Sequence, residues 1–278
     1  MTDYALIDSG RGEKLERFGE VTLIRPCAHA LWHPRSAKSV WKQAHARFSR
    51  EEGNQWEIYK PFPQTWEVCI EKIMFKLKAT SFGHLGIFPE HQMHWRWIRQ
   101  QIVEMGFTPQ ILNLFAYSGG ATLAAASENA SVSHVDAAKG MVEWARENAA
   151  LNGLEKCPVR WIVEDVKKYL GRAFRREIRY DAIVLDPPTF GRGRSKEVFK
   201  IERDILNLLE SCVALLSKRP RFLLLSCHTP GFTPLVLKQL LIETTLHLGG
   251  RVESGEMALP GPVELPSGTF ARWIADAH

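Results

Sequence analysis

From about residue 108 onward, short apolar runs alternate with segments whose apolar residues recur every three or four positions. Runs of this length predict buried strands, and the three- to four-residue spacing predicts amphipathic helices. The predicted strands cover residues 111–117, 131–137, 159–165, 180–186 and 221–228, with two closing strands over 251–260 and 269–276. Strands that alternate with helices indicate a mostly parallel sheet covered on both faces.

The longest predicted helix covers residues 196–217. Its apolar residues share one face, which contains Val198, Ile201, Ile205, Leu208, Leu209, Cys212, Leu215 and Leu216. A continuous apolar stripe of this kind is typical of a helix packed on a core. We therefore expect Cys212 to be a core residue.

The first part of the chain follows a different pattern. Between Tyr4 and about Pro89, short apolar and alternating runs separated by turns predict strands over residues 4–8, 14–19, 21–26, 65–70 and 74–79. One amphipathic segment, SVWKQAHARFSR at 39–50, predicts a helix. The chain thus divides into a β-rich domain over 1–90, a linking helix over 91–107 and an α/β domain over 108–278.

A glycine turn follows the first strand of the α/β domain, where Ser118, Gly119 and Gly120 precede a helix rich in small residues. Paired glycines allow the backbone to approach a nucleotide-type ligand, and an acid about 20 residues later binds a ribose hydroxyl. The GxGxxG template of NAD sites is not met here. S-adenosylmethionine, which has no pyrophosphate, fits this turn better, with Ser118, Gly119 and Gly120 close to its methionine part.

Three acids follow consecutive predicted strands. Asp136 ends the second strand, Asp165 the third and Asp186 the fourth. One such acid alone is more often a helix N-cap, but three at the same edge of a parallel sheet favour a ligand site. We expect Asp136 to bind the ribose and Glu164-Asp165-Val166 the adenine, with Asp186 near the reacting methyl group.

These motifs resemble a known family. NLFAYSGG, VDAAKGMVEWARENAALNGL, EDV, LDPPTFGRG and the upstream GHLGIFPEHQMHW are similar to class I S-adenosylmethionine-dependent methyltransferases, and especially to the cytosine-C5 methyltransferases of large-subunit ribosomal RNA. The similarity is to shorter relatives that lack a PUA RNA-binding domain. It implies a Rossmann-like, seven-stranded, mostly parallel sheet with a smaller N-terminal β-rich domain, and ribosomal RNA as the substrate.

The resemblance also implies a set of cofactor contacts. Residues at matching positions are Phe115, Tyr117, Ser118, Gly119, Asp136, Asp165 and Asp186, with Phe88, Pro89, Glu90 and Gln92 covering the cofactor from the linker. Asn113 stands where many methyltransferases carry an acid, and its amide oxygen can still accept a hydrogen bond.

The run Asp186-Pro187-Pro188-Thr189-Phe190 is the first candidate for acceptor chemistry. Prolines end the strand and expose Asp186 at the edge of the sheet. Phe190 is a candidate to stack on a target base, or else a buried residue of a rigid turn. Amino-group methyltransferases carry an aromatic residue where Thr189 stands.

Arg192 and Arg194 in the following glycine-rich loop are candidates for phosphate contacts, or else part of a solvated loop.

Cys227 is the second candidate. It ends the predicted strand 221–228, beside the strand that leads to Asp186. A thiolate that adds to carbon 6 of cytosine makes carbon 5 nucleophilic. In the cytosine-C5 family, an SC pair at this strand end supplies that nucleophile, and Cys227 matches it. A cysteine at the end of a buried strand is otherwise a small core residue.

Composition sets the wider context. The chain has 278 residues, of which 45% are hydrophobic and 24% charged, as in globular proteins with a buried core. It shows no secretion signal, no long apolar run and no metal-ligand spacing, so we expect a cytoplasmic protein without a metal or membrane partner. The net charge of +5 and the arginine-rich segments 172–179, 191–196 and 218–221 favour a polyanionic partner, although solvated surfaces explain them equally well.

Two other functions fit these residues. One is methylation of a base amino group or a small molecule without a covalent thiol intermediate. The other is a non-catalytic RNA-binding assembly factor that keeps the fold. The three acids at strand ends argue against the second. No pattern in the sequence indicates an oligomeric state.

Overall fold

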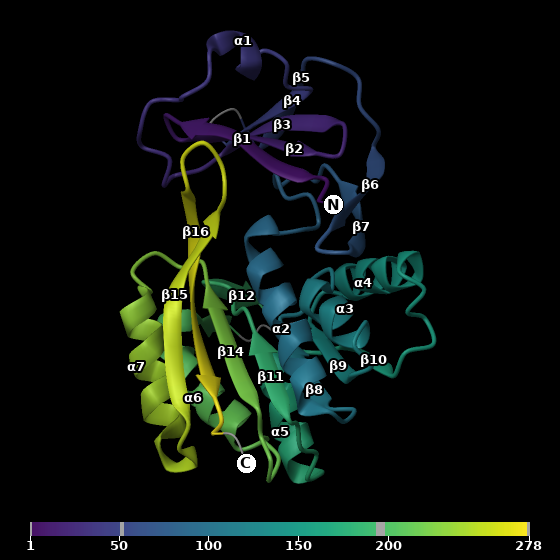
Figure 1. Ribbon diagram of the computed structural model, residues 1–278, viewed down its shortest axis with the longest axis vertical. Coiled ribbons are helices and arrows are strands. Elements are labelled where there is room, and N and C mark those ends of the chain that lie inside the picture. Colours follow the sequence, from purple (N-terminus) through teal and green to yellow (C-terminus); the bar gives the residue numbers. More distant parts are fainter. Residues whose placement is uncertain (1, 51–52, 193–197, 277–278) are drawn as a thin grey trace. The chain divides into compact units, whose positions relative to one another are not determined.

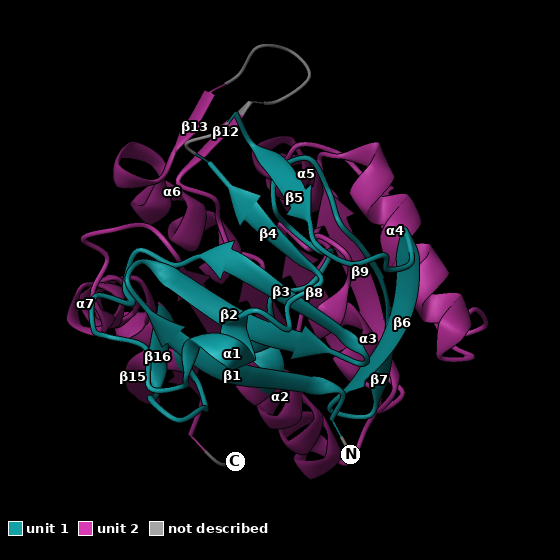
Figure 2. Ribbon diagram, turned by 90° about the horizontal axis from the view of Figure 1, so that it is seen from above, with its two compact units in different colours: residues 1–92, 258–267 teal, residues 93–257, 268–278 magenta. Residues whose placement is uncertain are grey.

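The chain folds into two compact units. The computed structural model describes residues 2–50, 53–192 and 198–276 (Figure 1). Unit 1 contains residues 1–92 and 258–267, and unit 2 contains residues 93–257 and 268–278 (Figure 2). Each unit is described by itself.

Unit 2 is built on a seven-stranded sheet in the order β10-β9-β8-β11-β14-β16-β15. Its strands are β8 (Gln110–Leu114), β9 (Ser131–Asp136), β10 (Val159–Val163), β11 (Ala182–Leu185), β14 (Phe222–Cys227), β15 (Arg251–Leu259) and β16 (Leu265–Ile274). The five strands from β10 to β14 are parallel, and β16 pairs with β14 in the antiparallel direction. The predicted seven-stranded, mostly parallel sheet is confirmed.

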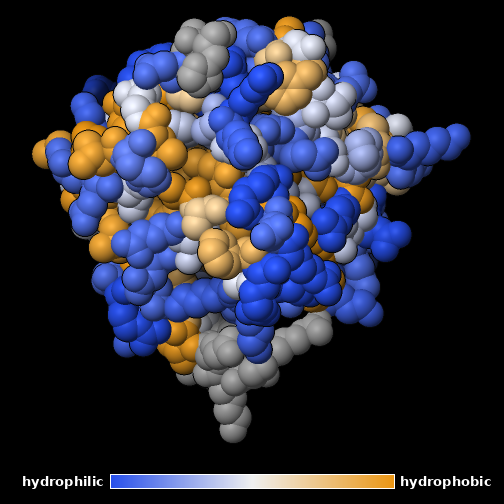
Figure 3. Space-filling view, turned by 90° about the horizontal axis from the view of Figure 1, so that it is seen from below, coloured by the Kyte–Doolittle hydropathy of each residue, from blue (hydrophilic) through white to orange (hydrophobic). Residues whose placement is uncertain are grey.

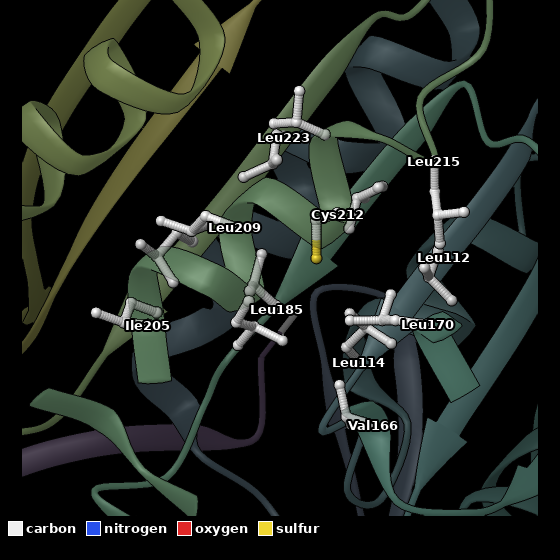
Figure 4. Packing of buried hydrophobic residues seen from close by; sticks show 14 of the residues in the cluster. Leu112, Leu114, Val166, Leu170, Leu185, Ile205, Leu209, Cys212, Leu215 and Leu223 are labelled. Carbon is white, nitrogen blue, oxygen red and sulfur yellow. The ribbon is translucent and has the colours of Figure 1, made fainter. Parts of the chain in front are cut away.

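Helices cover both faces of this sheet (Figure 1). They are α2 (Gln92–Met105), α3 (Gly120–Ala126), α4 (Lys139–Leu151), α5 (Val166–Arg175), α6 (Ile201–Val213) and α7 (Pro234–Thr245). Side chains of α5, α6 and α7 form one core with alternate residues of β8, β11 and β14, and those of α2 and α3 form a second core with the residues between them. Cys212 of α6 lies fully buried in the first core, as predicted (Figure 4).

The glycine at the start of α3 is required by close packing. A Cβ on Gly120 would lie 2.6 Å from the indole of Trp95, which is only 4% exposed. We expect Gly120→Ala to lower the free energy of unfolding by about 1–3 kcal/mol, because overpacking forces the neighbouring backbone to shift. Gly140 is the matched control, since a Cβ there meets nothing within 4 Å. Urea unfolding of both variants tests this, and equal changes would contradict it.

Unit 1 is β-rich and corrects one prediction. Its larger sheet has the order β1-β2-β3-β4-β5, and β6 and β7 form a separate hairpin. The strands are β1 (Tyr4–Gly10), β2 (Glu13–Phe18), β3 (Val21–Pro26), β4 (Ala46–Ser49), β5 (Gln55–Ile58), β6 (Thr65–Ile70) and β7 (Ile73–Lys78).

The helix predicted over residues 39–50 is wrong for most of its length. Only α1 (Lys38–Trp41) is helical, and β4 follows it. Ala46 and Phe48 are buried while the residues after each are half-exposed, which is the two-residue period of a strand. Pairing of β4 with β3 on one side and β5 on the other overrides the local helical pattern.

The long helix predicted over residues 196–217 is also shorter than expected. Val198 belongs to β13 (Val198–Lys200), which pairs antiparallel with β12 (Phe190–Arg192) before α6 begins. The ladder between β12 and β13 satisfies backbone groups that a longer helix would otherwise have bonded internally. Residues 193–197 lie outside the described part of the chain.

The tip of the hairpin formed by β15 and β16 belongs to unit 1, although its base belongs to unit 2. Within unit 1, a Cβ on Gly261 would lie 2.9 Å from the Leu6 side chain, so the tip packs closely on β1. The sequence pattern assigns residues 258–267 to the α/β domain and gives no sign of this return.

The described part of the chain contains no helix that is long and apolar enough to cross a membrane. On the face shown in Figure 3, hydrophilic residues predominate and apolar residues are scattered among them.

Candidate active site

The turn between β8 and α3 forms one wall of the candidate site. Phe115 and Tyr117 have φ angles of 53° and 51°, and Gly119 has a φ of 94°. Two non-glycine residues in the left-handed region within three positions are uncommon and mark a turn held by its surroundings. A Cβ on Gly119 would lie 3.1 Å from that of Ala145, so the turn also packs closely on α4.

Asp136 holds this turn from the end of β9. Its Oδ2 accepts a hydrogen bond from the backbone N–H of Tyr117 at 2.9 Å, and its Oδ1 accepts one from Ala138 at 2.8 Å. Burial raises the pKa of this carboxyl above its usual value, and the two backbone donors offset part of that rise. Each oxygen keeps a lone pair, which suits acceptance from a ribose hydroxyl.

Asp165 lies at the end of β10 and caps α5. Its Oδ1 accepts a hydrogen bond from the backbone N–H of Lys168 at 3.1 Å. The N-cap role therefore exists, and it leaves the second carboxylate oxygen for another partner. The preceding Glu164 forms an ion pair with Arg172, at 2.6 Å between Oε2 and Nη2.

Strand register brings these acids to one edge. Val163 of β10 pairs with Asp136 of β9, and Leu114 of β8 pairs with both Val135 and Leu185. Asp165 and Asp186 follow within two residues of the paired positions. Neighbouring strands lie about 4.8 Å apart, so the acids extend along the carboxyl edge as an elongated ligand requires.

Asp186 has two polar side-chain neighbours. Ser226 Oγ donates to Asp186 Oδ1 at 2.8 Å, and His228 Nε2 lies 3.7 Å from Oδ2. The Asp186 and His228 side chains are 28% and 33% exposed, so both are accessible to a substrate. The sequence indicates these neighbours, because side chains alternate between the two faces along β14. Ser226 and His228 therefore share one face, and Cys227 points to the other.

Cys227 lies at the predicted strand end but faces the core. It is 1% exposed and packs with Leu223 and Leu225, and its Sγ accepts the backbone N–H of Thr229 at 3.4 Å. Burial, together with the charge of Asp186, raises the pKa of the thiol, whereas the Thr229 donors lower it less. This environment disfavours the thiolate that nucleophilic attack requires.

The proline turn after Asp186 presents its aromatic residue to solvent. Pro187 is buried, Pro188 is exposed, and Phe190 at the start of β12 is 47% exposed. The hydroxyls of Thr189 and Thr229 are 2.8 Å apart and tie this turn to the segment after β14. Arg192 ends β12, and Arg194 lies outside the described residues, so their proposed phosphate contacts stay predictions.

The residues expected to cover the cofactor lie in unit 1. Phe88, Pro89 and Glu90 lie at or just before a 3-10 turn (Pro89–His91), and Gln92 begins α2. Pro89 and Glu90 are buried. Their contact with the cofactor stays a prediction.

A buried polar chain behind the glycine turn was not predicted. Thr122 Oγ1 accepts from the Asn113 amide and lies 2.9 Å from His134 Nδ1. Burial lowers the pKa of His134 to about 3, which keeps it neutral. Asn148 Nδ2 donates to the Ser118 carbonyl at 3.0 Å. In the sequence, this hydrogen-bonded set is indicated only by polar residues that interrupt apolar strands.

Known proteins show the same architecture. Residues 17–260 match the family model described as S-adenosylmethionine-dependent methyltransferase. The crystal structure of the SAM-dependent methyltransferase from Agrobacterium tumefaciens is 37% identical, covers 99% of this chain and 91% of its own, and has a TM-score of 0.94. A methyltransferase structure complexed with SAH is 19% identical, covers 98% of this chain and 76% of its own, and shares the fold with a TM-score of 0.75.

Curated relatives match a shorter region. The ribosomal RNA large subunit methyltransferase K/L of Shewanella baltica is 36% identical over 145 residues, which is 51% of this chain and 20% of that protein. The Vibrio cholerae protein of the same name is 31% identical over 170 residues, or 60% of this chain and 23% of that protein. The chain therefore spans about a fifth of the length of these relatives.

Proposed function

Because the chain belongs to the S-adenosylmethionine-dependent methyltransferase family, we propose that it methylates a base of ribosomal RNA. The names of the curated relatives support ribosomal RNA as the acceptor. The exposed Phe190, four residues after Asp186, supports a base as the target, because an aromatic ring can stack on an unpaired base.

The residues at the carboxyl edge of the sheet fit the cofactor. The left-handed turn from Phe115 to Gly119 leaves backbone close to the ligand position, and Asp136 and Asp165 each keep acceptor capacity. In this proposal Asp136 binds the ribose hydroxyls and Asp165 lies near the adenine. When bound, S-adenosylmethionine supplies a methyl group on a positively charged sulfur.

We propose that the acceptor is a base nitrogen and that no thiol adduct forms. The burial of Cys227 carries this preference, because an Sγ within the core cannot reach carbon 6 of a base without displacing its neighbours. Asp186, in contrast, is partly exposed and is held by Ser226. Its carboxylate would accept the proton that the nitrogen loses as the bond to the methyl carbon forms.

Methylation of cytosine at carbon 5 is the second candidate. Cys227 does end β14, the direct neighbour of β11, so its backbone position agrees with the nucleophile of the cytosine-C5 family. This route requires the thiol to turn from the core toward Asp186. The third candidate function is a non-catalytic assembly factor, which would bind RNA without methyl transfer.

Substitution of Cys227 separates these candidates. We expect Cys227→Ala to keep methyl transfer to ribosomal RNA within roughly threefold, since no step uses the thiol, with some loss of stability from the small cavity. Transfer is measured with radiolabelled cofactor, and adducts are sought on denaturing gels with RNA containing 5-fluorocytosine. Trapping of that RNA by the wild type but not by Cys227→Ala would instead support carbon 5. Absence of transfer by the wild type to any RNA would support the assembly factor.

A further inference from the structure

The carboxyl ends of the parallel strands in unit 2 form the candidate active site. Cations gather at the other edge of the sheet, where these strands begin, and we call this surface the basic rim. It consists of Arg175, Arg176, Arg179, Lys218, Arg219 and Arg221. Five of these side chains are exposed, and Arg221 is half-buried. The two segments that contain these cations also contain two acids, Glu177 and Asp181, so the six cations leave a local formal excess of four positive charges.

Backbone pairing joins two segments that are about forty residues apart in sequence. Tyr180 donates to the Leu215 carbonyl at 2.9 Å, Ser217 donates to Tyr180 at 2.8 Å, and Arg221 donates to Asp181 at 2.7 Å. Ser217 Oγ also donates to Asp181 Oδ1 at 2.7 Å. The arginines after α5 and the cations before β14 therefore form one surface.

The cations of this surface are not held in ion pairs within the described part of the chain. Among the described residues, none of the six side chains forms an ion pair, and Arg179 only donates to the carbonyl of Ile178. The carboxylate of the adjacent Asp181 keeps its negative charge, but its two oxygens accept hydrogen bonds from Ser217 Oγ and the N–H of Gln110. Cations at the C-terminus of α5 favour its dipole, which accounts for Arg175 but not for Lys218, Arg219 and Arg221.

Exposed aromatic rings accompany the cations. Phe174 is 55% exposed beside Arg175, and Phe107, shortly before β8, is 50% exposed. Figure 3 views the molecule from the side to which the amino ends of the parallel strands point, and strongly hydrophilic residues there surround apolar ones. Cations that contact phosphates, together with rings that stack on the unpaired bases of a folded RNA, are features of RNA-binding surfaces.

We propose that the basic rim is a second RNA-binding surface, which holds a large folded RNA at a distance from the active site. This inference rests on the proposed function and refines its substrate class. Asp181 and Asp186 flank β11 at opposite ends, about 16 Å apart along the strand at the rise of an extended chain. An RNA that contacts both the active site and the rim must therefore extend over at least this distance, as a large folded RNA does.

The test compares two double variants that lose equal charge. Arg179→Gln with Arg219→Gln alters the rim, and Arg146→Gln with Lys238→Gln alters exposed or half-exposed positions on α4 and α7. The probe is a transcribed domain of large-subunit ribosomal RNA. Affinity is measured between about 0.05 and 0.2 M salt, together with affinity for S-adenosylmethionine as a check on folding.

We expect the rim variant to bind the large RNA roughly tenfold more weakly, with the salt slope reduced by about 1.5, and the control variant to match the wild type. Affinity for the cofactor should not change. Equal behaviour of the two variants on the large RNA would overturn the proposal, as would loss of binding to phosphatidylserine vesicles with RNA affinity unchanged. Weaker RNA binding by the rim variant in a protein without methyl transfer would retain the surface and reject the proposed function.

Discussion

Replacing Asp186 by asparagine is expected to slow methyl transfer by roughly a hundredfold or more at saturating cofactor, because the amide cannot accept the proton of the acceptor nitrogen. The amide is the same size and its oxygen can still accept from Ser226 Oγ, so the fold should persist. Single-turnover assays with radiolabelled cofactor measure the rate, and calorimetry measures cofactor affinity.

The control is Ser226→Ala, which removes the 2.8 Å hydrogen bond to Asp186 but leaves the charge. Its rate should fall far less, by roughly the tenfold that one hydrogen bond provides. A rate for Asp186→Asn within threefold of the wild type would exclude a role for this carboxylate in proton transfer.

The second large effect concerns Asp136. We expect Asp136→Ala to weaken cofactor binding by roughly ten- to a hundredfold, since it removes a carboxylate acceptor and leaves the N–H groups of Tyr117 and Ala138 without it. Asp181→Ala is the matched control, because Asp181 likewise accepts a backbone N–H but lies at the other edge of the sheet. Titration calorimetry measures both.

The same residue gives a pH dependence. Burial raises the pKa of Asp136, so its carboxylate protonates at a higher pH than an exposed aspartate does. Cofactor affinity should therefore be complete above that pKa and should fall as the pH is lowered through it. Asp136→Asn should bind weakly at all pH values with no such transition. An unchanged transition in this variant would assign it to another group.

The strand-end acids were predictable because parallel strands place their carboxyl ends at one edge whatever the details of packing. Asp136, Asp165 and Asp186 follow directly from the order of apolar runs. The direction of Cys227 was less accessible. Alternation separates it from Ser226, but only the packed helices α6 and α7 show which of the two faces lies in the core.

Strand β4 could not be predicted from the local spacing of apolar residues. The segment around Ala46 and Phe48 satisfies both a helical and a two-residue spacing, and its pairing with Leu23 and Ile24 of β3 decides between them. A contact between residues so far apart in sequence has no local signal. The positive φ angles of Phe115 and Tyr117 were hidden for the same reason, since Asp136 stabilises that turn from another strand.

The return of residues 258–267 to unit 1 has a consequence for synthesis on the ribosome. Residues 1–92 emerge first but lack the hairpin tip that packs on Leu6 until all of the intervening 165 residues, 93–257, have been made. At about 5–20 residues per second, this part of β1 stays uncovered for roughly ten to thirty seconds. The N-terminal unit is thus completed only after most of the catalytic unit has been translated, so the unit that begins to emerge first must wait for a segment made near the end of the chain.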